Sequence, residues 1–558
     1  MADKDDDRPS ARDGTQQSEE VSSKETAGLS RRHFMAAGTG AAAAALVAHG
    51  AAFDGQAQER RQRATNASEY YESFDEPPVE YSRDGVLRAT LRVAEAVIPV
   101  RENTGLRLER TRCYNGLVPG PTLKLRPGEE LKIRLINELP GNPDAHCGKD
   151  HVNRPHCFNT TNIHTHGLHV SPKAASDNPF LKIEPQTEYQ YCFRVPEFHP
   201  PGTFWYHGHR HGSTAAQVMN GLAGALIIEE PKGQQIVPEA KDLVWMLQEV
   251  TGKEAEKVYT CDHPRLSVTV NGKFQPTLRL RPGEVQRWRF ISATGMPGSY
   301  ADLRLLDENG KQQEMVLIAI DGYALRRAQK RSEYVLPPGG RADFLAQLLR
   351  PGRYSLMKRR FQGQARDQVL AWIDVEGALQ KMSLPERMPQ LPPFLNPITD
   401  DEISRRRTMR WQICPGQARG TTCEHFLDAK SCSELSQDEL VRNAFLIDGK
   451  PYDPDRVDHS IKLGTAEEWE IVNETGAEHP FHIHVNHFQV VREGVPPEEW
   501  VWQDTVSLPA DGSVKIRSRF RNYAGRFLLH CHILLHSDLG MMQNVEVLGD
   551  GLEPCKPA

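Results

Sequence analysis

The chain has 558 residues, enough for three or four domains of ordinary size. Hydrophobic residues make up 38% and charged residues 25%, which is typical of a soluble globular protein, and the formal net charge of -6 gives no basis for binding nucleic acid or an anionic membrane, so we expect neither partner. The 43 glycines and 39 prolines, together with few long helical patterns, favour a turn-rich β protein.

The first 57 residues are predicted to be a disordered leader and an export signal. Residues 1–29 are polar and charged, and they are followed by Ser30-Arg31-Arg32-His33-Phe34 and a stretch rich in alanine and glycine. Paired arginines before a weakly apolar stretch resemble a twin-arginine signal, which makes the twin-arginine export machinery an expected partner. The stretch is too short for a confident membrane span, so we expect cleavage between about Ala51 and Gln58 and no stable membrane anchor, with an uncleaved anchor as the alternative. The protein is then expected to be periplasmic or secreted.

A strand, a tight turn and a second strand recur three times along the chain. In each copy, nine residues separate the turn glycine from the polar residue that ends the second strand: Gly128 to Asn137, Gly283 to Ser292 and Gly464 to Asn473. The copies are roughly 150 to 180 residues apart, which is the size of a domain. We therefore predict an all-β protein of three consecutive, similar β-sandwich domains, at residues 75–232, 233–384 and 398–549.

A second similarity relates the first domain to the third. Gly202-Thr-Phe-Trp-Tyr-His207-Gly208-His209 aligns with Gly525-Arg-Phe-Leu-Leu-His530-Cys531-His532, whereas the corresponding Pro351–Lys358 segment of the second domain contains no histidine. We therefore expect metal in the first and third domains and interpret the second as a spacer. Gly208 stands where the third domain has Cys531, so only the third domain offers a thiolate.

Histidines in four short motifs are the candidate metal ligands. Alternate side chains of an extended strand point to opposite faces, so the two histidines of each His-x-His pair share a face. Cys531 lies between two histidines and points to the other face, as does His479, three residues before His482. This alternation predicts a mononuclear site of His479 and Cys531, to which we add His536. It also predicts a cluster of the other motif histidines between the first and third domains. The cluster consists of His164, His166, His207, His209, His482, His484, His530 and His532.

The types of ligand predict copper. A thiolate with two imidazoles and a weak axial thioether is the ligand set of a blue copper site, and Met541, ten residues after Cys531, is the axial candidate. Eight histidines are enough for three further coppers with positions open to dioxygen. Zinc, the main competitor for a histidine cluster, has no redox chemistry and no use for this thiolate. One short backbone segment would then join an electron-entry site to a second metal centre.

With all four motifs present, the chain resembles the three-domain multicopper oxidases of the laccase type over roughly residues 80–548. The resemblance implies cupredoxin-like Greek-key β-sandwiches, no copper in the second domain, and four copper ions in all. It implies that the type 1 copper is held by His479, Cys531, His536 and Met541. It further implies that the type 2 copper is held by His164 and His482, and that the binuclear type 3 site is held by His166, His207 and His532 on one copper and by His209, His484 and His530 on the other.

The same resemblance implies a reaction. A phenolic or other aromatic donor would give one electron at a time near the type 1 copper, the electron would cross Cys531 to His530 and His532, and four such transfers would reduce one dioxygen to two waters. Met541 in place of an apolar residue should lower the type 1 potential and favour easily oxidised donors. Oxidation of Cu(I), Fe(II) or Mn(II) is the alternative, although Met541-Met542 is the one adjacent methionine pair in the sequence and gives little support to a Cu(I) specialist.

Two other classes fit the sequence less well. A non-catalytic scaffold of the same architecture would have lost its metal ligands, whereas this chain retains them. A two-domain nitrite reductase would lack the third repeat and the paired His-x-His motifs.

Reduction of dioxygen also requires protons, so an acid is expected near the cluster. Asp177, eleven residues after His166, is the candidate by resemblance, and a turn aspartate in Ser-Asp-Asn-Pro is its equal alternative. Relatives often carry Glu directly after the last type 1 histidine, where this chain has Ser537, so Asp538 is the second candidate. Asp504 also resembles a family position, with either a functional or a structural role.

Several other residues are interpreted more simply. His169, His211 and His487 neighbour the motifs but are expected to support the site or lie at the surface, not to bind metal. The chain has ten cysteines, and nine remain once Cys531 is a ligand, so at least one thiol stays free if the others pair. The pairing itself is left open. Two loops are rich in cysteine, one with Cys147 and Cys157 and one with Cys414, Cys423 and Cys432.

Overall fold

The structure, a computed structural model, describes residues 72–102, 105–142, 147, 152–259, 267–360, 367–414 and 444–556. The predicted leader and two of the clustered cysteines, Cys423 and Cys432, lie outside these ranges. Within them, every helix is too short or too polar to cross a lipid bilayer.

The first sandwich is built from residues 79–228. Its strands are β1 (Val79–Tyr81), β2 (Val86–Glu102), β3 (Gly105–Tyr114), β4 (Thr122–Leu125), β5 (Glu130–Asn137), β6 (His164–His166), β7 (Thr187–Arg194), β8 (Gly202–His207) and β9 (Ala223–Ile228), and helix α2 (Thr214–Asn220) precedes β9. One sheet has the order β1-β4-β9-β8-β6 and the other the order β3-β2-β5-β7.

The second sandwich is built from residues 241–375. Its elements are β10 (Lys241–Glu249), the 3-10 helix η2 (Gly252–Tyr259), β11 (Val268–Val270), β12 (Thr277–Leu280), β13 (Val285–Ala293), β14 (Ala301–Leu306), β15 (Gln312–Gln313), β16 (Met315–Ile320), β17 (Tyr323–Arg331), β18 (Glu333–Leu336), β19 (Arg341–Gln347), β20 (Gly352–Arg359) and β21 (Gln368–Val375). One sheet has the order β11-β10-β13-β19-β16-β17 and the other the order β12-β21-β20-β14-β15, with β18 also paired to β14.

The third sandwich follows a connecting segment with the 3-10 helices η3 (Pro393–Leu395) and η4 (Asp400–Glu402). Its elements are β22 (Ile403–Cys414), β23 (Ala444–Ile447), β24 (His459–Lys462), β25 (Thr465–Asn473), β26 (His479–Ile483), β27 (Phe488–Val490), η7 (Pro497–Glu499), β28 (Trp502–Gln503), β29 (Thr505–Leu508), β30 (Ser513–Phe520), β31 (Gly525–Cys531), helix α4 (Leu534–Asp538) and β32 (Met542–Leu548). Its sheets have the orders β23-β22-β25-β30-β27-β28 and β24-β32-β31-β26-β29.

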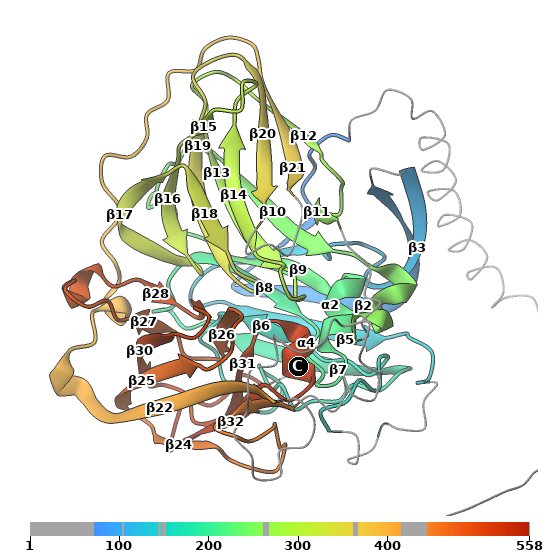
Figure 1. Ribbon diagram of the computed structural model, residues 1–558, viewed down its shortest axis with the longest axis vertical. Helices are drawn as coiled ribbons and strands as arrows, with labels where there is room; N and C mark the ends of the chain where they lie inside the picture. Colours follow the sequence, from blue (N-terminus) through green and yellow to red (C-terminus); the bar gives the residue numbers. More distant parts are fainter. Residues whose placement is uncertain are drawn as a thin grey trace, which may run out of the picture. The chain divides into compact units, whose positions relative to one another are not determined.

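Three consecutive β-sandwiches therefore account for the described chain, and the predicted all-β fold is confirmed (Figure 1). The strands of the second sandwich, green to yellow in Figure 1, form one layered group, and those of the third, orange to red, form another. The domain limits proposed from the sequence stay a prediction. Residues just before the first sandwich pack on the second, because Ser73 pairs with Thr277 and the ring of Phe74 lies 4.5 Å from that of Trp245.

The recurring turn seen in the sequence carries the chain from one sheet of each sandwich to the other. It joins β4 to β5, β12 to β13 and β24 to β25, and the two strands of each pair lie in different sheets. The turn glycines Gly128, Gly283 and Gly464 have φ values of 88°, 75° and 86°. Glycine adopts this left-handed region without steric cost, which explains why the glycine recurs.

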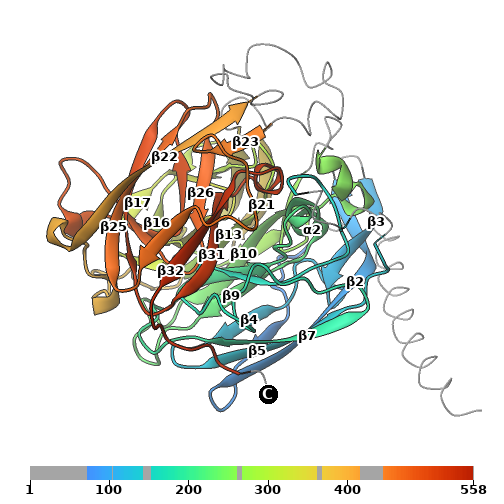
Figure 2. The same ribbon diagram turned by 90° about the horizontal axis from the view of Figure 1, so that it is seen from below.

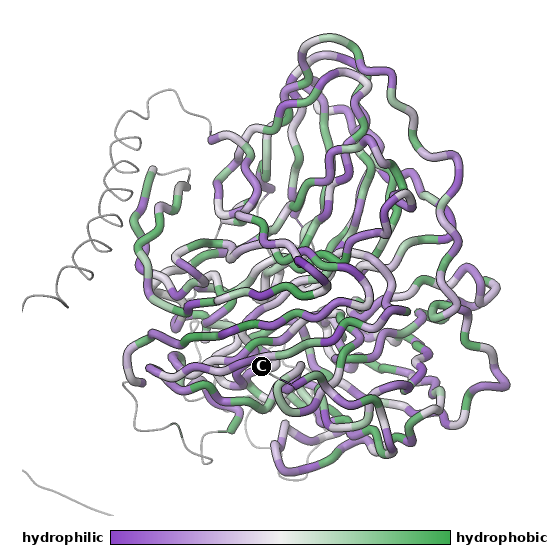
Figure 3. The backbone as a smooth tube through the Cα atoms, turned by 180° about the vertical axis from the view of Figure 1, so that it is seen from behind, coloured by the Kyte–Doolittle hydropathy of each residue, from purple (hydrophilic) through white to green (hydrophobic). Residues whose placement is uncertain are grey.

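Each sandwich has its own hydrophobic core. Some strands alternate between core and solvent, whereas β8, β9 and β13 are buried along their whole length. In β5, for example, Leu131, Ile133 and Leu135 are fully buried, whereas Arg134 between them is exposed. Figure 3 shows the corresponding alternation of hydropathy along the strands. The apolar face of each sheet is buried against the other sheet of the sandwich, and this burial holds the two sheets together.

Two disulfides are present among the described residues. Cys147 pairs with Cys157 within the first sandwich, and Cys192 of β7 pairs with Cys555, which follows the last strand of the third sandwich. Cys113 and Cys531 are free and buried thiols. The second disulfide ties the first sandwich covalently to the third.

Candidate metal centres

Cys531 ends strand β31, which lies between β26 and β32 (Figure 2). It stands opposite Phe481 in the pairing of β31 with β26, so it shares a face with His479, two residues before Phe481. The Sγ atom of Cys531 lies 3.4 Å from Nδ1 of His479 and 3.7 Å from Nδ1 of His536, and the two nitrogens are 3.3 Å apart. The structure thus brings together the three side chains assigned to a mononuclear site.

These three donor atoms fit a metal cation. Nε2 of His479 lies 2.8 Å from Oγ1 of Thr475, so Nδ1 is the atom that faces the thiol. Burial lowers the pKa of His479 to about 3, so this ring is neutral and has a free electron pair. Burial also raises the pKa of the Cys531 thiol well above its usual value. A bound cation would offset the energetic cost of burying the negative charge and so stabilise the thiolate.

Met541 is buried beside this group. Its backbone N–H donates to the carbonyl of His536 at 2.9 Å, and its carbonyl accepts from the N–H of Cys531 at 3.1 Å. The chain therefore returns to the site ten residues after Cys531. Its role as the axial ligand stays a prediction.

Eight histidines meet where β6 and β8 of the first sandwich face β26 and β31 of the third. His164 pairs with His207 across one sheet, and His482 pairs with His530 across the other. None of the eight rings is more than 2% exposed. Their ring nitrogens gather in groups that are close enough to share a metal ion: His164, His166 and His482; His166, His207 and His532; and His209, His484 and His530.

Nitrogen atoms from the two sandwiches point at one another within these groups. Nε2 of His164 lies 3.4 Å from Nε2 of His482, and Nε2 of His530 lies 3.0 Å from Nε2 of His209 and 3.3 Å from Nε2 of His484. Nδ1 of His530 is 2.9 Å from the carbonyl of Cys531, so it carries the ring proton and Nε2 carries the electron pair. Converging electron pairs of this kind fit a cation between them.

The remaining group supplies buried nitrogens that lack a partner. Nδ1 of His166, Nε2 of His207 and both ring nitrogens of His532 have no hydrogen-bond partner among the described residues. Buried polar atoms are rarely left unpaired, because the loss of hydration is costly. A metal bound by these three rings would satisfy them.

Five histidines of the eight-histidine cluster are neutral in the absence of metal. Burial, with the neighbouring rings adding to it, lowers the pKa well below the usual value for His164, His209, His484, His530 and His532. Neutral imidazole is the form that binds metal.

Asp177 lies directly behind one of these ligands. Both of its carboxylate oxygens are 3.0 Å from Nδ1 of His164, and Oδ1 also accepts from the N–H of Thr165 at 2.8 Å. Nε2 of His164 is then the atom left to face His482. Burial raises the pKa of Asp177 to about 7. Asp177 lies in a bend and also contacts a candidate ligand, His164. The two alternatives given for this residue, a turn aspartate and an acid near the cluster, are therefore compatible.

Asp538 contacts a different part of the first sandwich. Its carboxylate accepts from the N–H of Gly212 and from that of Ala215, both at 2.8 Å, at the start of α2, and from the hydroxyl of Tyr259 at 2.6 Å. Burial raises its pKa to about 6. These contacts dock α4 against α2, and the hydrogen bonds found for Asp538 among the described residues do not include a cluster histidine.

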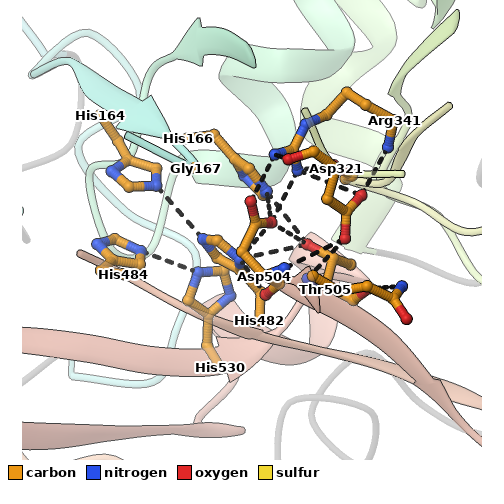
Figure 4. A network of polar contacts seen from close by, with 12 residues as sticks. His164, His166, Gly167, Asp321, Arg341, His482, His484, Asp504, Thr505 and His530 are labelled. Atoms are coloured by element: carbon orange, nitrogen blue, oxygen red, sulfur yellow. Dashed lines mark hydrogen bonds and ion pairs between the residues drawn. The ribbon is translucent and has the colours of Figure 1, made fainter. Parts of the chain in front are cut away.

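Asp504 belongs to a buried polar network that touches two ligands (Figure 4). Oδ1 of Asp504 lies 3.1 Å from Nε2 of His166, and its backbone carbonyl lies 2.9 Å from Nδ1 of His482. Arg341 and Asp321, both from the second sandwich, complete the network. Sequence reasoning missed these two residues, and no motif or spacing links them to the histidines. The second sandwich, interpreted from the sequence as a spacer, therefore also contributes two residues to the polar surroundings of the cluster.

The three neighbouring histidines have other partners. His169 lies 2.8 Å from the carbonyl of Val485 through Nδ1, and His211 lies 3.2 Å from Oδ1 of Asn153 through Nε2. The ring of His487 packs against those of Phe394 and Tyr323. All three thus contact residues other than the proposed ligands.

Comparison with known proteins gives a consistent result. Two family models described as multicopper oxidase match residues 151–233 and 427–550. A multicopper oxidase of Staphylococcus aureus is 30% identical over 452 residues, which cover 78% of this chain and 84% of the relative. A laccase of Bacillus subtilis (strain 168) is 25% identical over 493 residues, with 78% and 89% covered. The solved structure of a multicopper oxidase from Campylobacter jejuni, described as a metallo-oxidase, is 25% identical, with a TM-score of 0.67 over 86% of this chain and 96% of that one.

Proposed function

The chain belongs to the multicopper oxidases, and from this premise we propose that it couples the one-electron oxidation of phenolic or other aromatic donors to the four-electron reduction of dioxygen to water. It is an oxidoreductase that uses copper and dioxygen, and its three sandwiches have the cupredoxin-like fold of its relatives. The donor class and the number and types of copper are the parts that we propose.

One observation supports the proposal above all others. Cys531 faces His479 and His536 on one side of β31, while its two neighbours in sequence, His530 and His532, belong to the eight-histidine cluster. A single peptide link on either side of Cys531 therefore joins the two candidate sites. Such a connection has a clear use where electrons enter at one metal centre and are consumed at another.

Each set of side chains has a role in this proposal. When bound, copper would supply one-electron redox chemistry at the Cys531 site and the reduction of dioxygen among the eight histidines. His479, Cys531, His536 and Met541 would hold the type 1 copper, and His164 and His482 would hold the type 2 copper. The binuclear type 3 pair would be held by His166, His207 and His532 and by His209, His484 and His530.

Asp177 and Asp538 are the proposed acids. A buried carboxyl group with a pKa near neutrality can hold a proton and release it, which suits the delivery of protons to reduced oxygen. Asp177 is the better placed, because it contacts His164 directly. Asp538 reaches the start of α2, close to His209 in the chain, and would act at longer range.

We also propose that the protein is exported through the twin-arginine route and works in the periplasm or outside the cell, without a membrane anchor. The Cys147–Cys157 and Cys192–Cys555 disulfides support an oxidising compartment. Replacement of both Arg31 and Arg32 by lysine should leave the protein in the cytoplasm, as measured by cell fractionation. Unchanged export would contradict this route.

A metallo-oxidase acting on Cu(I), Fe(II) or Mn(II) is the second candidate. The likeness to the Campylobacter jejuni protein, which is described as a metallo-oxidase, favours it.

The deciding experiment is steady-state oxygen uptake by the copper-loaded protein. A methoxyphenol, Cu(I), Fe(II) and Mn(II) are compared at matched concentrations, with the Cys531→Ser variant as the control. The highest kcat/KM is expected for the phenol. A preference for a metal ion would favour the second candidate, and a fully metallated protein that consumed no oxygen with any donor would overturn both.

A further inference from the structure

The second sandwich reaches the eight-histidine cluster through Arg341. This residue is the first of β19, and its side chain is fully buried. Its guanidinium donates to both carboxylate oxygens of Asp504, with Nη1 2.7 Å from Oδ1 and Nη2 bonded to Oδ2. A bidentate pair of this kind fixes the orientation of the carboxylate as well as its position.

Arg341 is itself held by all three sandwiches. Nε donates to the carbonyl of Thr203, on the β8 strand of the first sandwich, at 3.2 Å. Nη2 donates to the carbonyl of Asp321 at 2.9 Å, and the Asp321 carboxylate accepts from the backbone N–H of Arg341 at 2.9 Å and from that of Thr505 at 3.0 Å. The guanidinium is therefore a fixed point at the junction of the three sandwiches (Figure 4).

Asp504, held in place by Arg341, contacts two candidate ligands. Its Oδ1 lies 3.1 Å from Nε2 of His166 and its carbonyl 2.9 Å from Nδ1 of His482. A carboxylate only accepts hydrogen bonds, so Nε2 of His166 carries the ring proton and Nδ1, which has no partner among the described residues, carries the electron pair. His166 belongs to the group formed with His207 and His532.

Two glycines make room for this arrangement. A side chain at Gly167, directly after His166, would collide with Nη2 of Arg341 and Oδ2 of Asp504. A side chain at Gly339, in the turn before Arg341, would lie 2.6 Å from the ring of His532. Both residues also have φ values in the left-handed region, +91° and +80°. The network is thus packed tightly beside His166 and against the ring of His532.

We propose that Arg341 is a positioning residue of the trinuclear copper cluster: by clamping Asp504, it fixes the His166 ring with Nδ1 toward the metal and the His482 ring with Nε2 toward the metal. The inference rests on the proposed function, because it presumes copper among the eight histidines. It assigns to the copper-free second sandwich a part in metal binding. Carboxylate partners of metal-bound histidines typically change metal affinity by about 10- to 100-fold.

The test compares Arg341→Gln with Arg289→Gln. Arg289 is another buried arginine of the second sandwich that reaches Thr203, through Oγ1 at 2.9 Å, but its carboxylate partners are Asp242 and Asp343 and not Asp504. Copper affinity is measured by titration against a chelator, and the type 1 and type 2 centres are followed by blue absorption and electron paramagnetic resonance.

We expect R341Q to retain blue absorption but to bind the cluster coppers about 10- to 100-fold more weakly, with an altered type 2 signal. Arg341→Lys, which keeps the charge but not the bidentate bond, should fall between R341Q and the wild type. R289Q should keep wild-type copper affinity even if its Tm falls. Wild-type copper affinity and an unchanged type 2 signal in R341Q would overturn the proposal, as would an equal loss in R289Q.

A charge-balanced variant covers the case in which R341Q does not fold. R341Q combined with Asp321→Asn removes one buried charge of each sign and should show the same cluster defect; tight copper binding in this double variant would count against the proposal. Failure of the proposed function looks different, because the wild type itself would then take up no cluster copper.

Discussion

Strand β20 of the second sandwich and strand β31 of the third occupy the same place in their sheets but carry different chemistry. Each begins with a glycine, and six residues later stands Lys358 in β20 and Cys531 in β31. Lys358 lies opposite Leu303 of β14, as Cys531 lies opposite Phe481 of β26. The two positions are therefore structural equivalents.

The surroundings differ as much as the residues themselves. Ala301 of β14 takes the place that His479 has in β26, two residues before the paired position. Lys358 is only 4% exposed, and its Nζ lies 4.0 Å from Oε1 of Glu249, whose other oxygen accepts from the hydroxyl of Ser299 at 2.6 Å. Burial lowers the pKa of Lys358.

One sandwich thus offers a thiolate and imidazoles at this position, and the other fills it with an ammonium and a carboxylate. The fold places a buried polar position at the same point in each, but the side chains alone decide whether metal is bound there. Four predictions test this comparison.

Cys531→Ser should have the largest effect. Serine keeps the size of the side chain but offers no thiolate, so the third sandwich should lose its proposed type 1 copper. We expect loss of blue absorption and of oxygen uptake to the background rate. Cys113→Ser, which changes the other free thiol found buried among the described residues, is the matched control and should keep both. Retained blue absorption in C531S would show that the Cys531 thiolate is not the copper ligand and would contradict the comparison between the two sandwiches.

Lys358→Met should destabilise the protein by about 3 kcal/mol, because it leaves the buried Glu249 carboxylate without its cation. Copper content should not change. The free energy of unfolding is measured by denaturant titration of the copper-free protein. Adding Glu249→Gln removes the unpaired charge and should recover most of the loss; a loss of copper in K358M would instead show that the ammonium supports the metal sites.

Met541→Leu should raise the type 1 redox potential, because it removes the weak thioether ligand. A redox titration of the blue absorption measures the change. As a control, Met357→Leu changes a methionine of β20 in the second sandwich, where we expect no copper, and should leave the potential unchanged. An unchanged or lower potential in M541L would argue against the axial role.

The smallest effect concerns pH. Since the pKa of Lys358 is lower in the folded protein than in the unfolded chain, the unfolded chain binds more protons between these two values, and stability rises with pH in that window. As the pH rises toward about 10.4, the ordinary pKa of a lysine side chain, the unfolding free energy of the wild type should therefore rise relative to that of K358M. Parallel curves for the two proteins would show that Lys358 does not titrate in this range.

The sequence was most informative where strand geometry controls the result. Side chains alternate along a strand, so parity alone separated Cys531 and His479 from His530 and His532, and the structure brings together the same groups. The repeat predicted three sandwiches because the same turn recurs in each of them, with a glycine at the position that has a positive φ.

Side-chain alternation along a strand could not predict contacts between residues that are far apart in the sequence and meet only in the folded protein. Arg341 and Asp504 are 163 positions apart and belong to different sandwiches, so no local pattern relates them. The partner of Cys192 was equally hidden, since Cys555 lies 363 residues away. Asp538 illustrates the reverse case: its place after His536 suggested contact with the cluster, whereas the turn of α4 directs it to α2.

The Cys192–Cys555 bond has a consequence for cleavage of the chain. A protease that cut once in the segment between the second and third sandwiches, residues 376–402, would produce two polypeptides that stay joined under non-reducing conditions. The fragment with β26 and β31 could not diffuse away from the fragment with β6 and β8, so the nicked protein would still hold both halves of the histidine cluster within one covalent molecule.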